Sequence, residues 1–318
     1  ASEAVAMVMM CCVACVVLTV LALATLGKIY SFVTVGKCRS TRDMSGKTVI
    51  ITGANRGIGK ETARELCRRH AHVILACRDV HKARAAAEEI ESDTGVRPEC
   101  MNLDLCSFHS IRQFAQQVLT QEERLDVLIN NAGILPPPGR RETKDGFEVT
   151  FQSNYLGHFL LTNLLLGLLK KSSPSRIINV GSIGHWMGTF DADVDFKKYR
   201  QNHVYTSTKL YMTLFTMDLA RRLAGTGVTA NCLHPGFVKS DFAHQSTDFY
   251  ARTVDFFICL FGKSVNDGAQ TSVHLAVTEE VEGVSGRMFS DCKPSFAPGK
   301  PQDAEALWDI SQRMAGLC

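Results

Sequence analysis

Short apolar, β-branched runs alternate with segments of helical periodicity along most of the chain. The first run, Thr48-Val49-Ile50-Ile51-Thr52, ends in a glycine turn and has the composition of a fully buried strand. Further strands are predicted over 73–77, 99–103, 127–129, 176–180 and 229–233, and helices over 57–69, 80–92, 107–121, 146–170 and 205–223. This alternation predicts an α/β fold, a doubly wound parallel sheet with helices on both faces.

A different pattern occupies the N-terminus. No charged residue lies between Glu3 and Lys28, and the run from Ala4 to Gly27 is almost entirely Ala, Val, Met, Cys, Leu and Thr. A helix of this length crosses a bilayer core of about 30 Å. We therefore expect a membrane anchor over residues 1–30, a basic linker over 31–45 and a single catalytic domain over 46–318.

Two other structures would also give an apolar run at the N-terminus. A cleaved signal peptide is suggested by Ala22-Leu23-Ala24, which resembles a small-x-small cleavage site, but the basic n-region is missing and the run is long. A buried core helix is disfavoured because the run has no polar face. Basic residues follow the run and only an acidic residue precedes it, so the positive-inside tendency leaves the domain facing the cytosol.

Composition narrows the classes of protein further. With 318 residues, 45% of them hydrophobic and 21% charged, the chain fits one globular domain plus an appendage. The net charge of +3 is too small and too scattered for nucleic-acid binding. The twelve cysteines are dispersed, as expected of reduced thiols in a cytosolic domain. No Cys-x-x-Cys pair accompanies a histidine pair at zinc-like spacing, so no metal site is expected.

The turn after the first strand has the features of a phosphate-binding loop. It reads Thr52-Gly53-Ala54-Asn55-Arg56-Gly57-Ile58-Gly59, with glycines spaced Gly-x-x-x-Gly-x-Gly between a strand and a helix. Glycines there permit a tight turn and close approach to a pyrophosphate, and the helix N-terminus supplies N–H donors. This context predicts a Rossmann-type dinucleotide site.

The end of the second strand bears on the choice of cofactor. NAD-binding sites usually place an acidic residue there, whereas this chain reads Ala76-Cys77-Arg78. Arg56 and Arg78 together could bind a ribose 2′-phosphate through charge-assisted hydrogen bonds. The sequence therefore favours NADP(H), the alternative being that both arginines simply lie on a solvated face.

A phenol and an ammonium lie four residues apart in Tyr205-Thr206-Ser207-Thr208-Lys209, hence on one face of a helix. A nearby cation favours the phenolate form of a tyrosine and so promotes proton transfer. Ser182 follows the strand predicted over 176–180, at the carboxyl end where ligands bind in parallel sheets. Such a Tyr and Lys pair is common on surface helices, so the order of the other motifs decides its meaning.

That order resembles the short-chain dehydrogenase/reductase superfamily. The glycine loop, Asn130-Asn131-Ala132-Gly133 and Pro235-Gly236 occur in the superfamily's order, as does an Asn, Ser, Tyr, Lys tetrad. The resemblance runs roughly from Gly46 to Leu317. Several short segments are similar to those of the microsomal retinol dehydrogenase branch. They are LACRD at 75–79, LDL at 103–105, LGHFLLT at 156–162, PSRIINV at 174–180, HPG at 234–236 and FSDC at 289–292. Gly181 departs from the branch, which commonly has a second serine there.

The resemblance implies a role for each residue of the site. Tyr205 would exchange the proton with the substrate oxygen, Lys209 would lower the pKa of Tyr205 and bind the nicotinamide ribose, Ser182 would polarise the carbonyl, and Asn154 would support a water. Asp104 would lie near the adenine and Asn130 near the adenosine ribose. The implied cofactor contacts are Gly53, Asn55, Arg56, Gly57, Ile58, Gly59, Arg78, Asp104, Leu105, Asn130, Ala132, Gly133, Tyr205, Lys209, Pro235, Gly236 and Val238.

A substrate lid is expected over about 237–263, where aromatic and aliphatic residues gather: Phe237, Phe242, Phe249, Tyr250, Phe256, Phe257, Ile258, Leu260 and Phe261. Such a cluster suits a long apolar ligand; the alternative is that these residues only cover the edge of the sheet or pack the core. By resemblance the substrate is retinol or retinal, reduction being the expected direction, and the location is the endoplasmic reticulum membrane. Steroids and lipid-derived aldehydes remain alternatives.

A catalytically silent dinucleotide-binding scaffold is the alternative from another class. It would not need the tetrad of Asn154, Ser182, Tyr205 and Lys209, all of which are present. The histidines at 158, 185 and 234 fit packed polar residues as well as they fit participants in the chemistry. The sequence leaves oligomerisation open.

Overall fold

The computed structural model describes residues 2–190, 194–239, 252, 258 and 262–317. Its centre is an eight-stranded sheet in the order β3-β2-β1-β4-β5-β6-β7-β8. All neighbouring strands from β3 to β7 pair in parallel, and β8 adds to β7 antiparallel. The predicted doubly wound parallel sheet is confirmed, with one antiparallel strand added at its edge.

The strands follow the predicted positions closely as far as β6. They are β1 (Thr48–Thr52), β2 (His72–Cys77), β3 (Glu99–Asn102), β4 (Val127–Asn130), β5 (Ser175–Val180), β6 (Val228–His234), β7 (Met288–Ser290) and β8 (Lys293–Ser295). The sequence analysis did not identify β7 and β8, which are only three residues long. Strands this short offer too few positions for a recognisable pattern of alternation.

The helices of the described residues are α1 (Ser2–Thr34), α2 (Gly57–Arg68), α3 (Val80–Thr94), α4 (Phe108–Gln121), α5 (Val149–Phe151), α6 (Gly157–Lys171), α7 (Gln201–Arg222), α9 (Val265–Val277) and α10 (Pro301–Met314). Shorter turns are the π-helix η1 (Gln152–Leu156) and the 3₁₀ helices η2 (Ile183–Met187) and η4 (Glu279–Val281). The single helix expected over 146–170 is therefore divided by the π-helix. Both α9 and α10 were missed by the sequence analysis.

Side-chain caps set where several helices begin. Asp79 accepts a hydrogen bond from the N–H of Lys82 at the start of α3, and Ser107 and Ser264 do the same for α4 and α9. A cap of this kind satisfies one of the free N–H groups of the first turn. The starting points of these three helices are thus set by local sequence.

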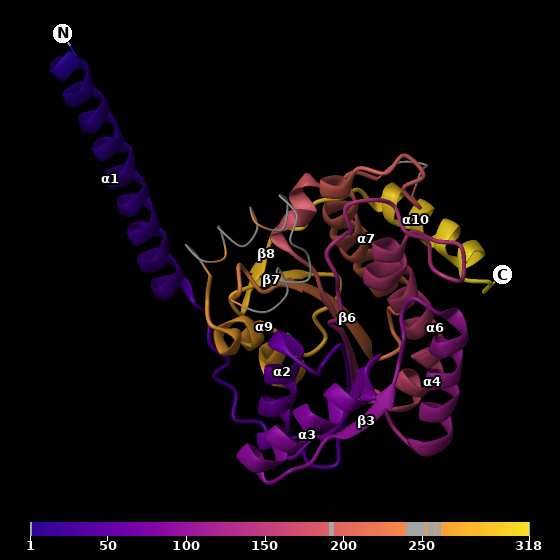
Figure 1. Cartoon of the computed structure of the whole chain (residues 1–318). Helices are drawn as coiled ribbons and strands as arrows, with labels where there is room; N and C mark the ends of the chain where they lie inside the picture. Colours follow the sequence, from indigo (N-terminus) through magenta and orange to yellow (C-terminus); the bar gives the residue numbers. More distant parts are fainter. Residues whose placement is uncertain (1, 191–193, 240–251, 253–257, 259–261, 318) are drawn as a thin grey trace.

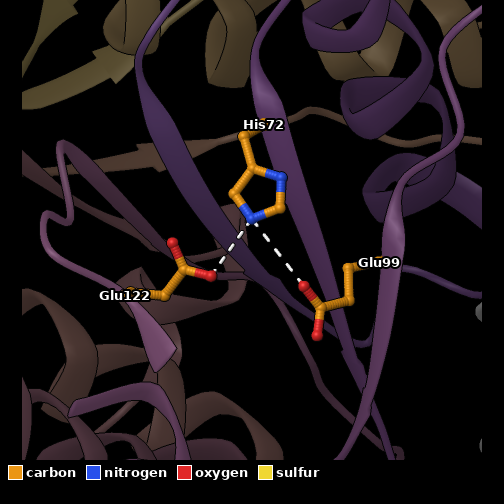
Figure 2. Close-up of side chains that lie close together, drawn as sticks. All are labelled: His72, Glu99 and Glu122. Atoms are coloured by element: carbon orange, nitrogen blue, oxygen red, sulfur yellow. Dashed lines mark hydrogen bonds and ion pairs between the residues drawn. The ribbon is translucent and has the colours of Figure 1, made fainter. Parts of the chain in front are cut away.

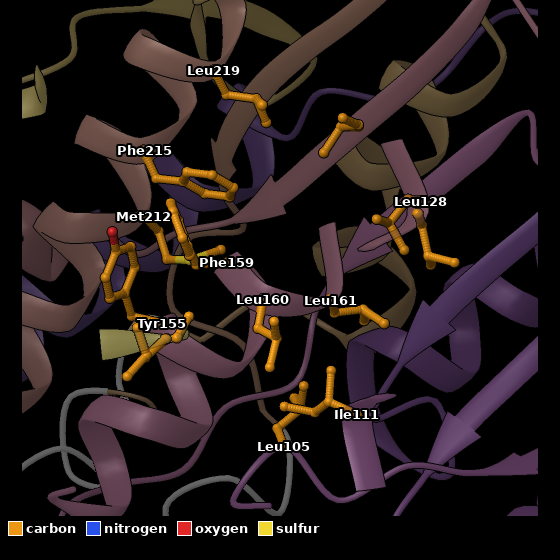
Figure 3. Packing of buried hydrophobic residues seen from close by; sticks show 14 of the residues in the cluster. Leu105, Ile111, Leu128, Tyr155, Phe159, Leu160, Leu161, Met212, Phe215 and Leu219 are labelled. Atoms are coloured by element: carbon orange, nitrogen blue, oxygen red, sulfur yellow. The ribbon is translucent and has the colours of Figure 1, made fainter. Parts of the chain in front are cut away.

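Two hydrophobic layers cover the two faces of the sheet. Ile50 packs with the layer formed by α4, α6, α7 and α10, part of which is drawn in Figure 3, while Val49 and Ile51 pack with α2, α3 and α9. Successive side chains of a strand point to opposite faces, so β1 is buried on both. This explains why its residues form a continuous apolar run.

Helix α1 projects from the body of the molecule (Figure 1). The part from Val5 to Gly27 has the length and composition of a membrane span, and none of it is buried in the protein. The helix continues to Thr34, past the boundary expected at residue 30. Beyond it, Gly36 donates to Asp291 Oδ1 (3.4 Å) and Cys38 donates to Gln270 Oε1 (3.0 Å), which attaches the linker to the β7–β8 turn and α9.

A buried amide network joins the strands behind the carboxyl edge. Asn130 Nδ2 donates to Asn179 Oδ1 (2.8 Å) and to Thr162 Oγ1 (3.0 Å), and Asn179 Nδ2 donates to Thr216 Oγ1 (2.8 Å). Asn130 and Asn179 are both almost completely buried. The network therefore links β4 and β5 to α6 and α7.

Replacing Asn130 with alanine should lower the free energy of unfolding by about 1–3 kcal/mol, because Asn179 Oδ1 would be left buried without its donor. Asn102→Ala, at the exposed end of β3, removes one solvent-exposed hydrogen bond to the carbonyl of Arg78 (2.9 Å) and should cost less, about 0.5 kcal/mol. Urea unfolding followed by circular dichroism measures both. An Asn130→Ala protein of unchanged stability with weakened dinucleotide binding would contradict this structural role.

Candidate active site

A cavity of about 510 Å³ lies along the carboxyl ends of the parallel strands. Gly53 follows β1, Arg78 follows β2, Ala132 follows β4 and Ser182 follows β5, and all four line it. Ligands bind at this edge of open α/β sheets. Every residue expected in the site lines the cavity except Asn130 and Asn154.

The glycine loop has the close packing that its spacing suggested. Gly53 has φ +66°, and a Cβ placed on it would lie 2.9 Å from Ala132. A Cβ on Gly59 would lie 2.5 Å from Asn131 Nδ2, which donates to the carbonyl of Thr52 (2.8 Å). The glycine loop therefore packs directly against Asn131 and Ala132, which follow β4. A larger residue at Gly53 or Gly59 would push the two segments apart.

The N-terminus of α2 opens onto this cavity. Arg56 is its N-cap residue and makes no side-chain hydrogen bond to the first turn. Both Arg56 and Gly57 line the cavity. The first-turn N–H groups and the helix dipole thus form a place suited to an anion.

Charged residues gather at the end of the cavity beside β2. Besides Arg56 and Arg78, the wall includes Asp79 and Lys82. Asp79 caps α3, and its other oxygen lies 3.5 Å from Lys82 Nζ. These bonds hold the pKa of Asp79 below its ordinary value. The sequence analysis missed Lys82, although its place three residues after a capping aspartate puts it in the first turn of a helix that begins at this edge.

Tyr205, Lys209 and Ser182 line the same cavity from two elements. Tyr205 and Lys209 lie one turn apart on α7, and Lys209 Nζ is 5.8 Å from the centroid of the Tyr205 ring. Ser182 begins η2, where its Oγ accepts from the N–H of Gly184 (3.1 Å). The chemistry expected of the three residues requires such a grouping.

Lys209 is a buried cation. Its Nζ donates to the carbonyl of Val180 at the end of β5 (2.9 Å). Burial lowers the pKa of Lys209 to about 8. Loss of hydration penalises the ammonium, which makes Lys209 a lysine that titrates near neutral pH.

Asn154 lies behind the cavity wall, within the π-helix. Its amide accepts from the N–H of Ile134 (2.8 Å), donates to the carbonyl of Ile134 (3.0 Å), and approaches Thr208 Oγ1 (3.4 Å). Insertions of this kind in helices are frequent at functional sites. Here the amide connects the segment after β4 to the helix that carries Tyr205 and Lys209. Asn130 also lies away from the cavity, in the amide network.

The three histidines singled out in the sequence are packed inside the domain. His158 Nε2 lies 2.9 Å from Thr52 Oγ1, and Nδ1 lies 3.2 Å from the carbonyl of Asn154. Burial lowers the pKa of His158 to about 3, so its ring is neutral. Since Asn154 O can only accept, Nδ1 carries the proton and Thr52 donates to Nε2. Burial also lowers the pKa of His185, to about 4, and that of His234.

The opposite end of the cavity is apolar and open. Ile183, Met187, Phe237 and Ile258 line it, and the first three are more than a third exposed. Next to them the exposed rings of Trp186 and Phe296 stack at 5.3 Å. Of the expected lid aromatics, Phe242, Phe249, Tyr250, Phe256, Phe257 and Phe261, and with them Leu260, lie outside the described residues.

Comparisons with known proteins agree with this architecture. The family model described as short chain dehydrogenase matches residues 47–251. Human retinol dehydrogenase 13 is 46% identical over 298 residues, which cover 90% of this chain and 89% of that protein. Human retinol dehydrogenase 11 is 46% identical over 288 residues, covering 89% of this chain and 90% of that protein.

Solved structures share the same fold. An uncharacterized protein from Mycobacterium paratuberculosis superposes with a TM-score of 0.70 at 33% identity, covering 88% of this chain and 98% of that one. RhlG from Pseudomonas aeruginosa, solved as an active-site complex with NADP, has a TM-score of 0.63 at 26% identity, covering 77% of this chain and 94% of that one. The chain belongs to the short-chain dehydrogenase family of NAD(P)-binding oxidoreductases, in the branch of the retinol dehydrogenases.

Proposed function

We propose that this protein is an NADP(H)-dependent reductase of a lipophilic aldehyde, most simply retinal, which it converts to retinol. The observation that carries the proposal is the convergence of Tyr205, Lys209 and Ser182 on one cavity at the carboxyl edge of the sheet. A scaffold that only bound a dinucleotide would have no use for this grouping.

The nicotinamide, when bound, supplies the hydride for the carbonyl carbon. Tyr205 donates its phenolic proton to the substrate oxygen as negative charge develops there. The Lys209 ammonium stabilises the phenolate left behind, and its place in a buried site strengthens that interaction. Ser182 donates a hydrogen bond to the same substrate oxygen and so fixes the carbonyl for attack.

The cofactor preference rests on the charges beside β2. Arg56, Arg78 and Lys82 supply three cations, and Asp79 is engaged in capping α3 and pairing with Lys82. With Asp79 engaged in this way, the excess of cations favours a 2′-phosphate over a ribose hydroxyl. The relative RhlG, solved with NADP, supports the same preference.

The substrate and the location follow from the apolar features of the chain. Relatives of about 46% identity are named retinol dehydrogenases, and the open end of the cavity is walled by Ile183, Met187 and Phe237. A membrane-spanning α1 would keep this mouth near a lipid phase that dissolves retinoids. We place the domain on the cytosolic side of the endoplasmic reticulum membrane, because basic residues follow the span.

Tyr205→Phe should lower kcat for retinal reduction by about a hundredfold or more, since the proton donor is removed while the ring stays. NADPH binding should be retained. Tyr211→Phe, on the same helix but buried among other aromatic rings, is the matched control and should keep its rate. The measurement is NADPH oxidation with all-trans-retinal. Equal rates for Tyr205→Phe and the native chain would overturn the assignment.

Arg78→Gln should weaken NADPH binding by about tenfold or more and leave NADH binding nearly unchanged, because a charge-assisted bond to the 2′-phosphate is lost. Lys82→Gln should act in the same direction. Lys60→Gln is the control, since its ammonium pairs with Glu89 outside the cavity. Fluorescence titration of both dinucleotides gives the ratio. An equal loss for NADH and NADPH would show that the 2′-phosphate is not what Arg78 recognises.

The pKa of Lys209 near 8 predicts a pH dependence. The ammonium is present below this pH and is lost above it, so kcat/KM for NADPH should fall as the pH rises through about 8. An ordinary lysine, with a pKa of about 10.4, would keep its charge well beyond that range. Initial rates of NADPH oxidation against pH provide the profile. A kcat/KM that stays level to about pH 10 would contradict the role given to this cation.

A further inference from the structure

Three metal-ligating side chains meet at the other end of the sheet from the cavity. His72 is the first residue of β2, Glu99 the first of β3, and Glu122 directly follows α4. The cavity takes the opposite end of β2, at Cys77. Figure 2 shows the imidazole of His72 directed between the two carboxylates.

The separations are near those between the ligands of one ion. His72 Nε2 lies 3.1 Å from Glu122 Oε1 and 3.8 Å from Glu99 Oε2, and the three ligand atoms all lie within 4.8 Å of one another. Zinc bonds of about 2.0–2.2 Å at tetrahedral angles put neighbouring ligand atoms roughly 3.3–3.5 Å apart. A small rotation of the exposed Glu99 side chain would close the remaining difference.

The surroundings hold one ligand firmly and leave the others accessible. The Glu122 side chain is only 13% exposed, and its second oxygen lies 3.4 Å from Thr48 Oγ1. His72 and Glu99 are 46% and 41% exposed, so water could complete the coordination. Two carboxylates with a neutral imidazole carry a charge of about −2, which matches a divalent cation.

We propose that His72, Glu99 and Glu122 form a binding site for a divalent transition-metal ion of the zinc type. An imidazole nitrogen with carboxylate oxygens suits zinc and its neighbours, whereas calcium and magnesium are bound mainly by oxygen. The competing arrangement is a protonated His72 paired with the two carboxylates and no metal. The three ligands are far apart in sequence, and for this reason no motif in the sequence indicates the site.

A metal bound there would join the edge strands β2 and β3 to the end of α4. It would lie outside the cavity, so the site is independent of the function proposed above. A metal ion that binds the folded chain and not the unfolded chain stabilises the fold, and the gain in stability grows with the logarithm of the metal concentration. The expected role is therefore structural.

The test titrates ZnCl2 into the full chain in detergent micelles by isothermal calorimetry, with a non-thiol reductant present. His72→Ala and Glu122→Gln should each lose one equivalent of zinc or bind it at least about tenfold more weakly. His70→Ala is the matched control: its Nδ1 pairs with Asp43 Oδ1 at 2.9 Å, and no third ligand is grouped with this pair in the described part of the chain. The cysteines contribute the same background to every form.

Thermal melts give a second readout. Zinc should raise the melting temperature of the native chain and of His70→Ala, but not of His72→Ala or Glu122→Gln. NADPH oxidation by all four forms should be equal, which separates failure of this site from failure of the proposed reaction. Identical zinc isotherms and identical zinc-dependent melting for all four forms would overturn the proposal and leave the metal-free ion pairs as the explanation.

Discussion

The hydrogen bond from the buried Lys209 ammonium to the carbonyl of Val180 connects α7, the helix that carries Tyr205 and Lys209, to the sheet. The carbonyl belongs to the last residue of β5, and Ser182 follows two residues later, so this contact joins α7 to the strand that leads into the serine. Tyr205 lies one turn before Lys209 and takes its place from the same helix. Because a buried cation without a partner is costly, this contact also fixes where α7 can pack.

Behind the cavity, polar side chains replace part of the hydrophobic packing. Thr52 at the end of β1 contacts His158 on α6, His158 contacts the carbonyl of Asn154, and the amide of Asn154 binds Ile134 after β4. The neutral state of His158, with its low pKa, makes this chain of bonds insensitive to pH in the physiological range. The cavity wall is thereby held by directional bonds, which position side chains more narrowly than apolar contacts do.

The two ends of the sheet carry different features, a cavity at the carboxyl ends of the strands and a side-chain cluster at the amino ends. The carboxyl ends form the cavity because the strands β1 to β7 run the same way, so every turn that follows a strand reaches the same edge. The amino ends carry the His72, Glu99 and Glu122 cluster, remote from the reaction. The apolar mouth of the cavity and the α1 helix give the chain two surfaces suited to lipid. The residues of both lie outside the strands of the sheet.

The sequence by itself determined the elements up to β6, the glycine loop, the Tyr205 and Lys209 pair and the apolar N-terminal run, because each depends on neighbours within a few residues. Periodicity, caps and motif spacing are local properties. It also placed Ser182 correctly after its strand. Tertiary structure alone decided that Asn130 joins a buried network, that Lys82 lines the cavity, and that His72 meets two glutamates from other elements. It also divided the helix at Asn154 and added β7 and β8, whose short strands are stabilised by pairing with β6 and with each other. These outcomes depend on contacts between residues distant in the chain, whose partners no local pattern records.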